Sequence, residues 1–205
     1  MAKLQMSKRP TQMREKQAAA SVGQCELMFI YDKFFSQYGS KIAQLLLTKT
    51  ITENSILRDN AINTLKTLFE LAVIPIVNEN DSIAVDEITY GDNDTLSAVT
   101  ATLIHADLLI LLSDIDGLYN DNPTSNPHAS LIPIVTEIDE HIFSMAQGVG
   151  SKLGTGGMAT KLQAAKIATD AGIPMVIANG ETMSIVELYF IRRNTYELNR
   201  RCKTL

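Results

Sequence analysis

The sequence has little of what disulfide-rich, metal-binding and membrane-spanning proteins need. It contains two cysteines and three histidines in 205 residues. Cys25 and Cys202 have no second thiol near them, and the histidines share no metal-ligand spacing, so we expect no disulfide framework and no zinc site. No apolar run approaches the roughly 18 residues of a membrane span, and no apolar segment follows the basic start. These absences favour a cytoplasmic protein that spans no membrane.

The sequence also lacks a basic character and any hydrolase signature. Its net charge is -5, and a nucleic-acid partner would call for a basic face instead. No G-x-S-x-G motif occurs, and the histidines and cysteines form no catalytic pairing. Hydrophobic residues make up 45% and charged residues 20%, which are ordinary globular values. One compact domain is therefore expected.

Strands and helices are expected to alternate along the chain. The expected elements, in order, are a helix over 17–38 that closes at Gly39, a strand over 42–47, a helix capped by Asn54 or Ser55, a strand over 73–77, a helix over 95–105, a strand over 108–112, a helix over 138–147, a helix over 158–171 and a strand over 173–178. This alternation predicts an α/β fold with a parallel sheet and right-handed crossovers. The first helix is apolar on most sides, which predicts that it is buried or forms an interface of a homo-oligomer.

Two polar segments flank one long loop at a predicted strand edge. Asn78 to Asp81 follows a strand directly, and Gly91 to Asp94 precedes a helix. Ligands of open parallel sheets bind beyond the carboxyl ends of the strands, so these amides and carboxylates are candidate ligand contacts. Alternatively, asparagine and aspartate here only form turns and cap helices.

A glycine-rich segment at 150–157 opens the predicted helix 158–171. Glycines let backbone N–H groups approach an oxyanion, and Lys161 in the first helical turn can reach a phosphate. The segment differs from the G-x-x-x-x-G-K-[ST] motif, and a surface loop with a solvated lysine is the alternative. The segment 113–119 follows the most apolar strand, where a nucleotide base or ribose would be held, or it is merely a type I turn.

Four motifs occur in a fixed order: VNENDSI at 77–83, YGDNDTLSA at 90–98, LLSDIDGLY at 111–119 and GTGGMATK at 154–161. Together they resemble the amino acid kinase family. SNP at 125–127 and QAAASVGQ at 17–24 resemble its glutamate 5-kinase members in particular. The resemblance implies a three-layer α/β/α sandwich with a mainly parallel central sheet, formed by residues 1–189. The basic segment 190–205 has no resemblance to the family.

The resemblance implies an enzyme that transfers the γ-phosphate of ATP to the side-chain carboxylate of L-glutamate, the first step of proline biosynthesis. Mg²⁺ would accompany the nucleotide, and proline would be a feedback inhibitor. By the same resemblance, Asp81 and Asn93 hold glutamate with support from Asn78. Lys161 neutralises the transferring phosphate, and Asp94 orients the lysines of the site. The nucleotide contacts are implied to be Ser113, Asp114, Thr155, Gly156, Gly157, Met158 and Lys161, with no metal ligand among the protein residues.

The sequence departs from the family pattern at its start. The family begins with a Lys-x-Gly-[Ser/Thr]-Ser type motif and a strand that ends in Ser-Ser-Gly-Ala, and neither occurs here. We therefore expect that the first βαβ unit of the fold is missing and that the activity of this chain alone is impaired. Two alternatives stay open: a kinase of another acidic amino acid, or a non-catalytic module that binds glutamate or proline.

Overall fold

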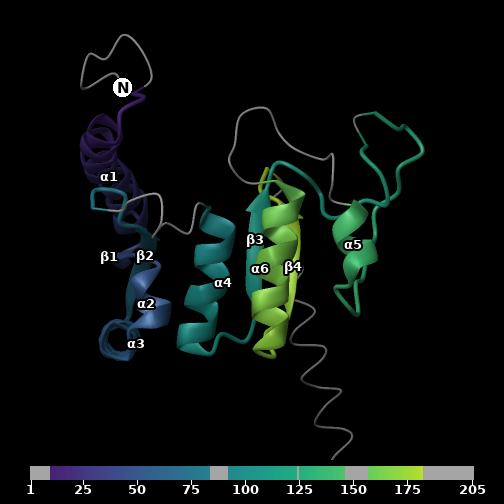
Figure 1. The fold of residues 1–205 in the computed structure, drawn as a ribbon. Coiled ribbons are helices and arrows are strands. Elements are labelled where there is room, and N and C mark those ends of the chain that lie inside the picture. Colours follow the sequence, from purple (N-terminus) through teal and green to yellow (C-terminus); the bar gives the residue numbers. More distant parts are fainter. Residues whose placement is uncertain (1–9, 84–91, 124, 146–156, 182–205) are drawn as a thin grey trace, which may run out of the picture. The chain divides into compact units, whose positions relative to one another are not determined.

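A computed structural model of the chain describes residues 10–83, 92–123, 125–145 and 157–181. The chain divides into two compact units, Met1–Ala106 and Asp107–Leu205, which we call unit 1 and unit 2. Unit 1 contains α1 (Met13–Ser36), β1 (Lys41–Leu47), α2 (Thr50–Glu53), α3 (Ser55–Glu70), β2 (Val73–Glu79) and α4 (Asn93–Ile104) (Figure 1). Unit 2 contains β3 (Leu109–Ser113), α5 (Glu140–Met145), α6 (Met158–Asp170) and β4 (Met175–Asn179).

Unit 1 is built around a parallel strand pair. β1 and β2 pair in register from Lys41 opposite Val73 to Leu47 opposite Glu79, so both carboxyl ends lie at the same edge. α1 packs against β1, while α3 and α4 pack against β2. The core between them is apolar and consists of Leu47, Ile51, Ala61, Leu96 and Leu103, with Leu45, Ile62, Val77 and Val99 against it. The parallel pairing confirms the predicted α/β class for this half.

The helices of unit 1 begin and end at residues with local reasons to do so. Asn54 caps α3, because its side-chain oxygen accepts from the Leu57 N–H at 3.1 Å. Gly39 follows α1 with φ +67°, a left-handed conformation that glycine adopts at little cost. His105 ends α4 in the same region at φ 51°. The predicted cap and glycine stop are both confirmed.

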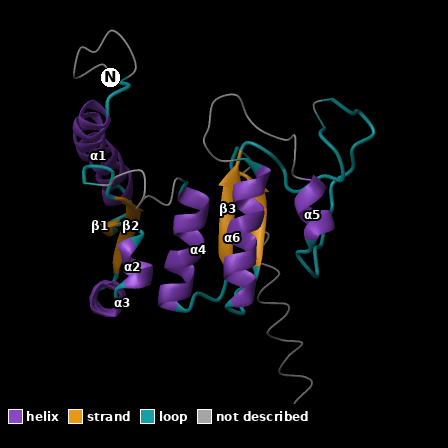
Figure 2. Cartoon of the chain, viewed as in Figure 1, coloured by secondary structure: helices purple, strands orange, loops and turns teal. Residues whose placement is uncertain are grey.

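Unit 2 contains a second parallel pair. β3 and β4 run in register from Leu109 opposite Met175 to Ser113 opposite Asn179. α6 contacts β4, and Figure 2 shows this helix alongside the strands of unit 2. Its buried face carries Met158 and Leu162, which form a core cluster with Leu118. The second parallel pair confirms the α/β class here as well.

Several expectations from the sequence differ from the structure. α2 was not predicted, because four residues are too few to show a periodicity. β2 includes Asn78 and Glu79, so the polar segment begins inside the strand rather than after it. α1 has no buried residue in the part of the chain that the structure describes, so the structure does not support the alternative that this helix is buried. The segments 84–91, 146–156 and 182–205, with the glycine-rich turn and the basic tail, lie outside the described residues.

None of the described helices is both long and apolar enough to cross a membrane.

Candidate functional site

A cavity of about 200 Å³ opens in unit 1 beside the carboxyl ends of β1 and β2. One wall comes from α1, a second from the end of β1, and a third from the residues that follow β2. Its lining residues are Ala20, Ser21, Gln24, Cys25, Gln44, Leu46, Glu79, Asn80, Asp81 and Ser82. The predicted ligand edge of the sheet is therefore hollowed, with one predicted site residue, Asp81, in its wall.

Asp81 sits in a turn that is tied back to β1. The Asn80 N–H donates to the Leu47 carbonyl at 2.7 Å, and the Ser82 hydroxyl donates to Asn80 Oδ1 at 2.5 Å. Partial burial raises the pKa of the Asp81 carboxyl above its ordinary value, although the residue is exposed overall. A partly desolvated carboxylate in a cavity wall is suited to a cationic group of a ligand.

Asn78 joins the cavity through a residue that sequence reasoning missed. Its Nδ2 donates to Gln24 Oε1 at 2.9 Å, which connects β2 to α1 across 54 residues of sequence. Gln24 itself lines the cavity. The motif QAAASVGQ contained Gln24, but nothing in a helical pattern shows which polar residue will face a strand end.

The segment before α4 has a capping role in the structure. Asp92 caps the helix, because its carboxylate accepts from the Thr95 N–H at 2.7 Å and from the Thr95 hydroxyl at 3.0 Å. Asn93 is exposed on the first turn, and Asp94 follows half-buried. The described residues that line the cavity include neither Asn93 nor Asp94. The capping alternative is therefore confirmed for Asp92, and the roles of Asn93 and Asp94 stay predictions.

In unit 2, polar residues gather where β3 and β4 end. The Ser113 hydroxyl donates to Asp114 Oδ1 at 3.0 Å, and the Gly180 N–H donates to the Ser113 carbonyl at 2.8 Å. Asn179 Nδ2 donates to Asp116 Oδ1 at 2.9 Å. Sequence reasoning singled out Ser113 and Asp114 but missed Asn179, because the predicted strand stopped one residue before it.

The start of α6 has no side-chain cap. Gly157 is its N-cap residue with extended backbone, and among the described residues no side-chain cap bonds this helix start. Met158 and Lys161 lie in the first turn, and both side chains are buried, Lys161 at 8% exposure. Thr155 and Gly156 lie outside the described residues. The start of a helix carries partial positive charge, which suits an anion.

A larger cavity in unit 2, of about 370 Å³, is lined mainly by apolar residues between β4, α6 and the segment 131–138. Asp116 lines this cavity, but Ser113, Asp114, Gly157 and Lys161 do not, so the cavity contains none of the predicted nucleotide contacts among the described residues. Among the residues that the structure describes, no group of three or more His, Cys, Asp or Glu could hold a metal ion.

Comparison with known proteins identifies the family of this chain. Residues 2–179 match the amino acid kinase family. The glutamate 5-kinase of Clostridium perfringens is 52% identical over 188 residues, which cover 90% of this chain and 70% of that protein. The glutamate 5-kinase of Clostridium acetobutylicum is 54% identical over 184 residues, with coverages of 90% and 69%. A solved structure of carbamate kinase from Giardia lamblia bound to AMP-PNP aligns at 20% identity over 58% of this chain and 38% of that chain, with a TM-score of 0.44. The chain belongs to the amino acid kinase family, among relatives named glutamate 5-kinase.

Proposed function

We propose that the chain phosphorylates the side-chain carboxylate of L-glutamate with ATP, as the first step of proline biosynthesis in the cytoplasm. The observation that carries this proposal is the small polar cavity of unit 1, with Asp81 in its wall. Relatives at about 50% identity, named glutamate 5-kinase, support glutamate as the occupant.

The cavity chemistry fits an amino acid. The Asp81 carboxylate can pair with the ligand's ammonium group, and the amides of Asn78 and Asn80 can bond its polar ends. A volume of about 200 Å³ admits a small substrate rather than a drug-sized ligand. Asn93 joins this set in our proposal as a further glutamate contact from the start of α4.

The nucleotide belongs to unit 2 in this proposal. Ser113 and Asp114 lie at the carboxyl end of β3, where parallel sheets bind ligands. The uncapped start of α6 at Gly157 and Met158, with Lys161 in its first turn, supports phosphate binding there. Thr155 and Gly156 immediately precede this helix start. Mg²⁺ is bound mostly through substrate phosphates in such enzymes, so it would arrive with ATP and neutralise phosphate charge.

The reaction requires little covalent help from the protein. A carboxylate oxygen of glutamate attacks the γ-phosphorus, the bond from that phosphorus to the bridging oxygen breaks, and ADP leaves with the electron pair. A carboxylate is already ionised at neutral pH, so no general base is needed. The protein's part is to position two anions and to stabilise charge on the moving group. In the proposal Lys161 stabilises that charge, and Asp94 keeps the role that the family resemblance implies, which is to orient the lysines of the site.

Trapping the acyl phosphate tests the proposal. The chain, ATP, Mg²⁺ and L-glutamate are incubated with hydroxylamine, and the γ-glutamyl hydroxamate is measured by its iron complex. We expect hydroxamate only when all components are present, and less of it with L-aspartate. ADP release without hydroxamate, or equal rates with both amino acids, would contradict glutamate as the acceptor.

The apolar face of α1 supports a second copy of the chain as a partner. Ile30 and Phe34, which are four residues apart on α1, are 44% and 58% exposed in the chain by itself. Exposed apolar side chains on one face of a helix are typical of protein interfaces. We propose a homo-oligomer that covers this face.

We also propose that proline, as a feedback inhibitor, competes with glutamate for the cavity in unit 1.

A further inference from the structure

Gln24 occupies a position that its sequence context does not explain. It lies on α1, where its side chain lines the cavity of unit 1, and its Oε1 accepts from Asn78 Nδ2 at 2.9 Å. This bond fixes the Asn78 amide at the end of β2. Gln24 therefore holds a neighbouring amide in place and also forms part of the cavity wall.

The nitrogen of the Gln24 amide, in contrast to its oxygen, lacks a hydrogen-bond partner in the described structure. Gln24 Nε2 is buried and has no hydrogen-bond partner among the described residues. A buried donor left unpaired costs about 1–3 kcal/mol. Because Gln24 is one of the residues that line the cavity, a ligand whose acceptor reaches this nitrogen would regain the penalty.

The rest of the cavity wall offers few donors to an anion. Among the described lining residues, the charged side chains are the carboxylates of Glu79 and Asp81, and none is lysine, arginine or histidine. The two serine hydroxyls already donate, Ser21 to the Gln17 carbonyl at 2.9 Å and Ser82 to Asn80 Oδ1 at 2.5 Å. A carboxylate in this cavity must therefore rely on neutral amide donors.

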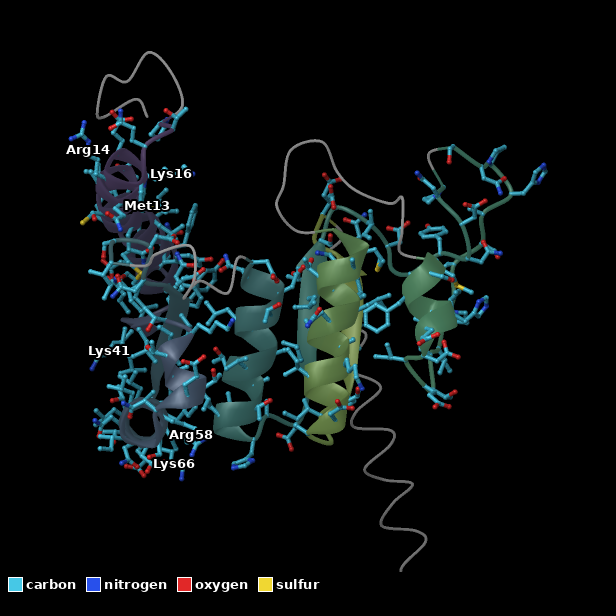
Figure 3. All side chains as sticks on the ribbon, in the orientation of Figure 1. Met13, Arg14, Lys16, Lys41, Arg58 and Lys66 are labelled. Carbon is cyan, nitrogen blue, oxygen red and sulfur yellow. The ribbon has the colours of Figure 1, made fainter. Side chains whose placement is uncertain are left out.

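Three basic side chains of unit 1 lie toward the other end of the strands. Figure 3 shows Lys41, Arg58 and Lys66 toward the end of the unit where β1 begins, and Lys41 is the first residue of that strand. The cavity adjoins the opposite strand end. The Gln24 amide is thus a neutral donor in a wall whose charges are negative.

We propose that Gln24 is a specificity-determining residue, whose Nε2 donates to a carboxylate of the amino-acid substrate while its Oε1 positions Asn78. This inference rests on the proposed function, because it names a contact to glutamate in the same cavity. It predicts that the enzyme distinguishes an acid from its amide partly because Gln24 Nε2 can only donate, which suits a carboxylate oxygen and not an amide nitrogen.

Three variants of the full chain test the inference by isothermal titration with L-glutamate. Gln24→Met removes both the donor and the acceptor, and we expect the Kd to rise about tenfold or more, as for a lost hydrogen bond to a charged group. The unfolding temperature without ligand should change little, since the removal of an unpaired buried donor offsets the loss of the bond to Asn78. Gln37→Met makes the same change at the end of α1, outside the lining of the cavity, and should leave the Kd unchanged.

Gln24→Glu tests for a direct contact with the ligand, because a residue that only positions Asn78 would not change the preference between an acid and its amide. It keeps an acceptor for Asn78 but replaces the donor by a carboxylate, which favours an amide on the ligand over an acid. L-Glutamine carries an amide in its side chain, and L-isoglutamine carries one in place of the α-carboxyl. We expect the Kd of one of them to come closer to the Kd of L-glutamate. The amide for which the difference in Kd shrinks identifies the carboxylate that Gln24 contacts.

The outcomes separate this inference from the function on which it rests. If the parent chain does not bind L-glutamate at all, the proposed substrate is wrong and the inference falls with it. If the parent binds L-glutamate while Gln24→Met binds as tightly and Gln24→Glu keeps the full preference over both amides, only the role of Gln24 is overturned.

Discussion

Asp81 combines a position in the cavity wall with a cost to folding. Its carboxyl lines the cavity of unit 1, and partial burial raises its pKa above the ordinary value of 3.8. Desolvation disfavours the ionised form, and the ionised form is the one that pairs with an ammonium group. The residue is therefore expected to favour binding and to oppose stability at neutral pH.

Asp81→Asn should separate these two effects. A carboxyl whose pKa is raised in the folded state binds protons more readily there, so stability falls as pH rises from 3.8 through the raised pKa. Removing the charge should raise the unfolding temperature at pH 7 by about 1–2 °C, and the gain should vanish below pH 3.8. Calorimetry between pH 3 and pH 7 measures this difference. Asp59→Asn, on an exposed position of α3 outside the cavity lining, serves as control, and a pH-independent gain would contradict the account.

Helix starts differ in what they offer a ligand. Asn54 and Asp92 occupy the N-terminal donors of α3 and α4, whereas α6 begins at Gly157 with no side-chain cap. A capping side chain would stabilise α6, but it would also compete with a bound phosphate. A glycine at the N-cap of α6, which leaves this position without a capping side chain, is consistent with the proposed nucleotide site.

Gly157→Asp should therefore raise stability and weaken nucleotide binding. Gly157 has φ −116°, so an aspartate can take its backbone conformation without strain. A carboxylate N-cap should stabilise the helix by a few tenths to about 1 kcal/mol, while its charge repels phosphate and raises the Kd for ATP about tenfold or more. Denaturant unfolding and ATP titration measure the two effects. Asn54→Asp places the same carboxylate at the start of α3, and an equal loss of ATP affinity there would contradict the site.

The face of α1 should decide the assembly state. Ile30→Ser with Phe34→Ser removes two exposed apolar side chains, 44% and 58% exposed, and should convert an oligomer into a monomer. Light scattering coupled to size-exclusion chromatography measures the mass. Phe69→Ser on α3, at a 48% exposed residue, should leave the mass unchanged. A monomeric parent chain would refute the partner that we propose.

The elements were largely predictable from sequence where local chemistry decides them. The Asn54 cap and the Gly39 stop fixed two helix boundaries, and apolar runs located the strands. β2 extends beyond its predicted end because Asn78 and Glu79 pair across to Leu46 and Leu47 of β1, which local polarity does not reveal. Candidate residues next to strand ends were predictable from that position alone. Gln24 was not, because its partner lies 54 residues away.

At the scale of the whole molecule, the predicted residues fall into two sets. Those assigned to glutamate, Asn78, Asp81 and Asn93, all belong to unit 1 together with Asp94. Those assigned to the nucleotide, Ser113, Asp114, Gly157, Met158 and Lys161 among the described residues, all belong to unit 2. The two substrates of the proposed reaction thus have separate sets of ligands.

Hydrogen exchange should report these two sets separately. L-Glutamate should slow amide exchange in residues 20–25 and 78–83, and a non-hydrolysable ATP analogue with Mg²⁺ should slow it in residues 157–165. Bound ligand reduces local opening, so amides that exchange through local opening near each ligand should gain the most protection. Mass spectrometry of peptic peptides resolves these segments. Protection of the 78–83 segment by the nucleotide alone would contradict the assignment.

The central claim is that the cavity of unit 1 holds L-glutamate, and Cys25 provides the most direct measurement. This exposed thiol lines the cavity beside Gln24, so a bound ligand should shield it from alkylation. With Cys202→Ser to remove the second thiol, L-glutamate at ten times its Kd should slow modification by iodoacetamide about tenfold, as occupancy of the site requires. The account also predicts that Asp81→Asn weakens this protection. The account is contradicted if L-glutamate leaves the alkylation rate of Cys25 unchanged while the same chain forms γ-glutamyl hydroxamate. That result would place glutamate elsewhere.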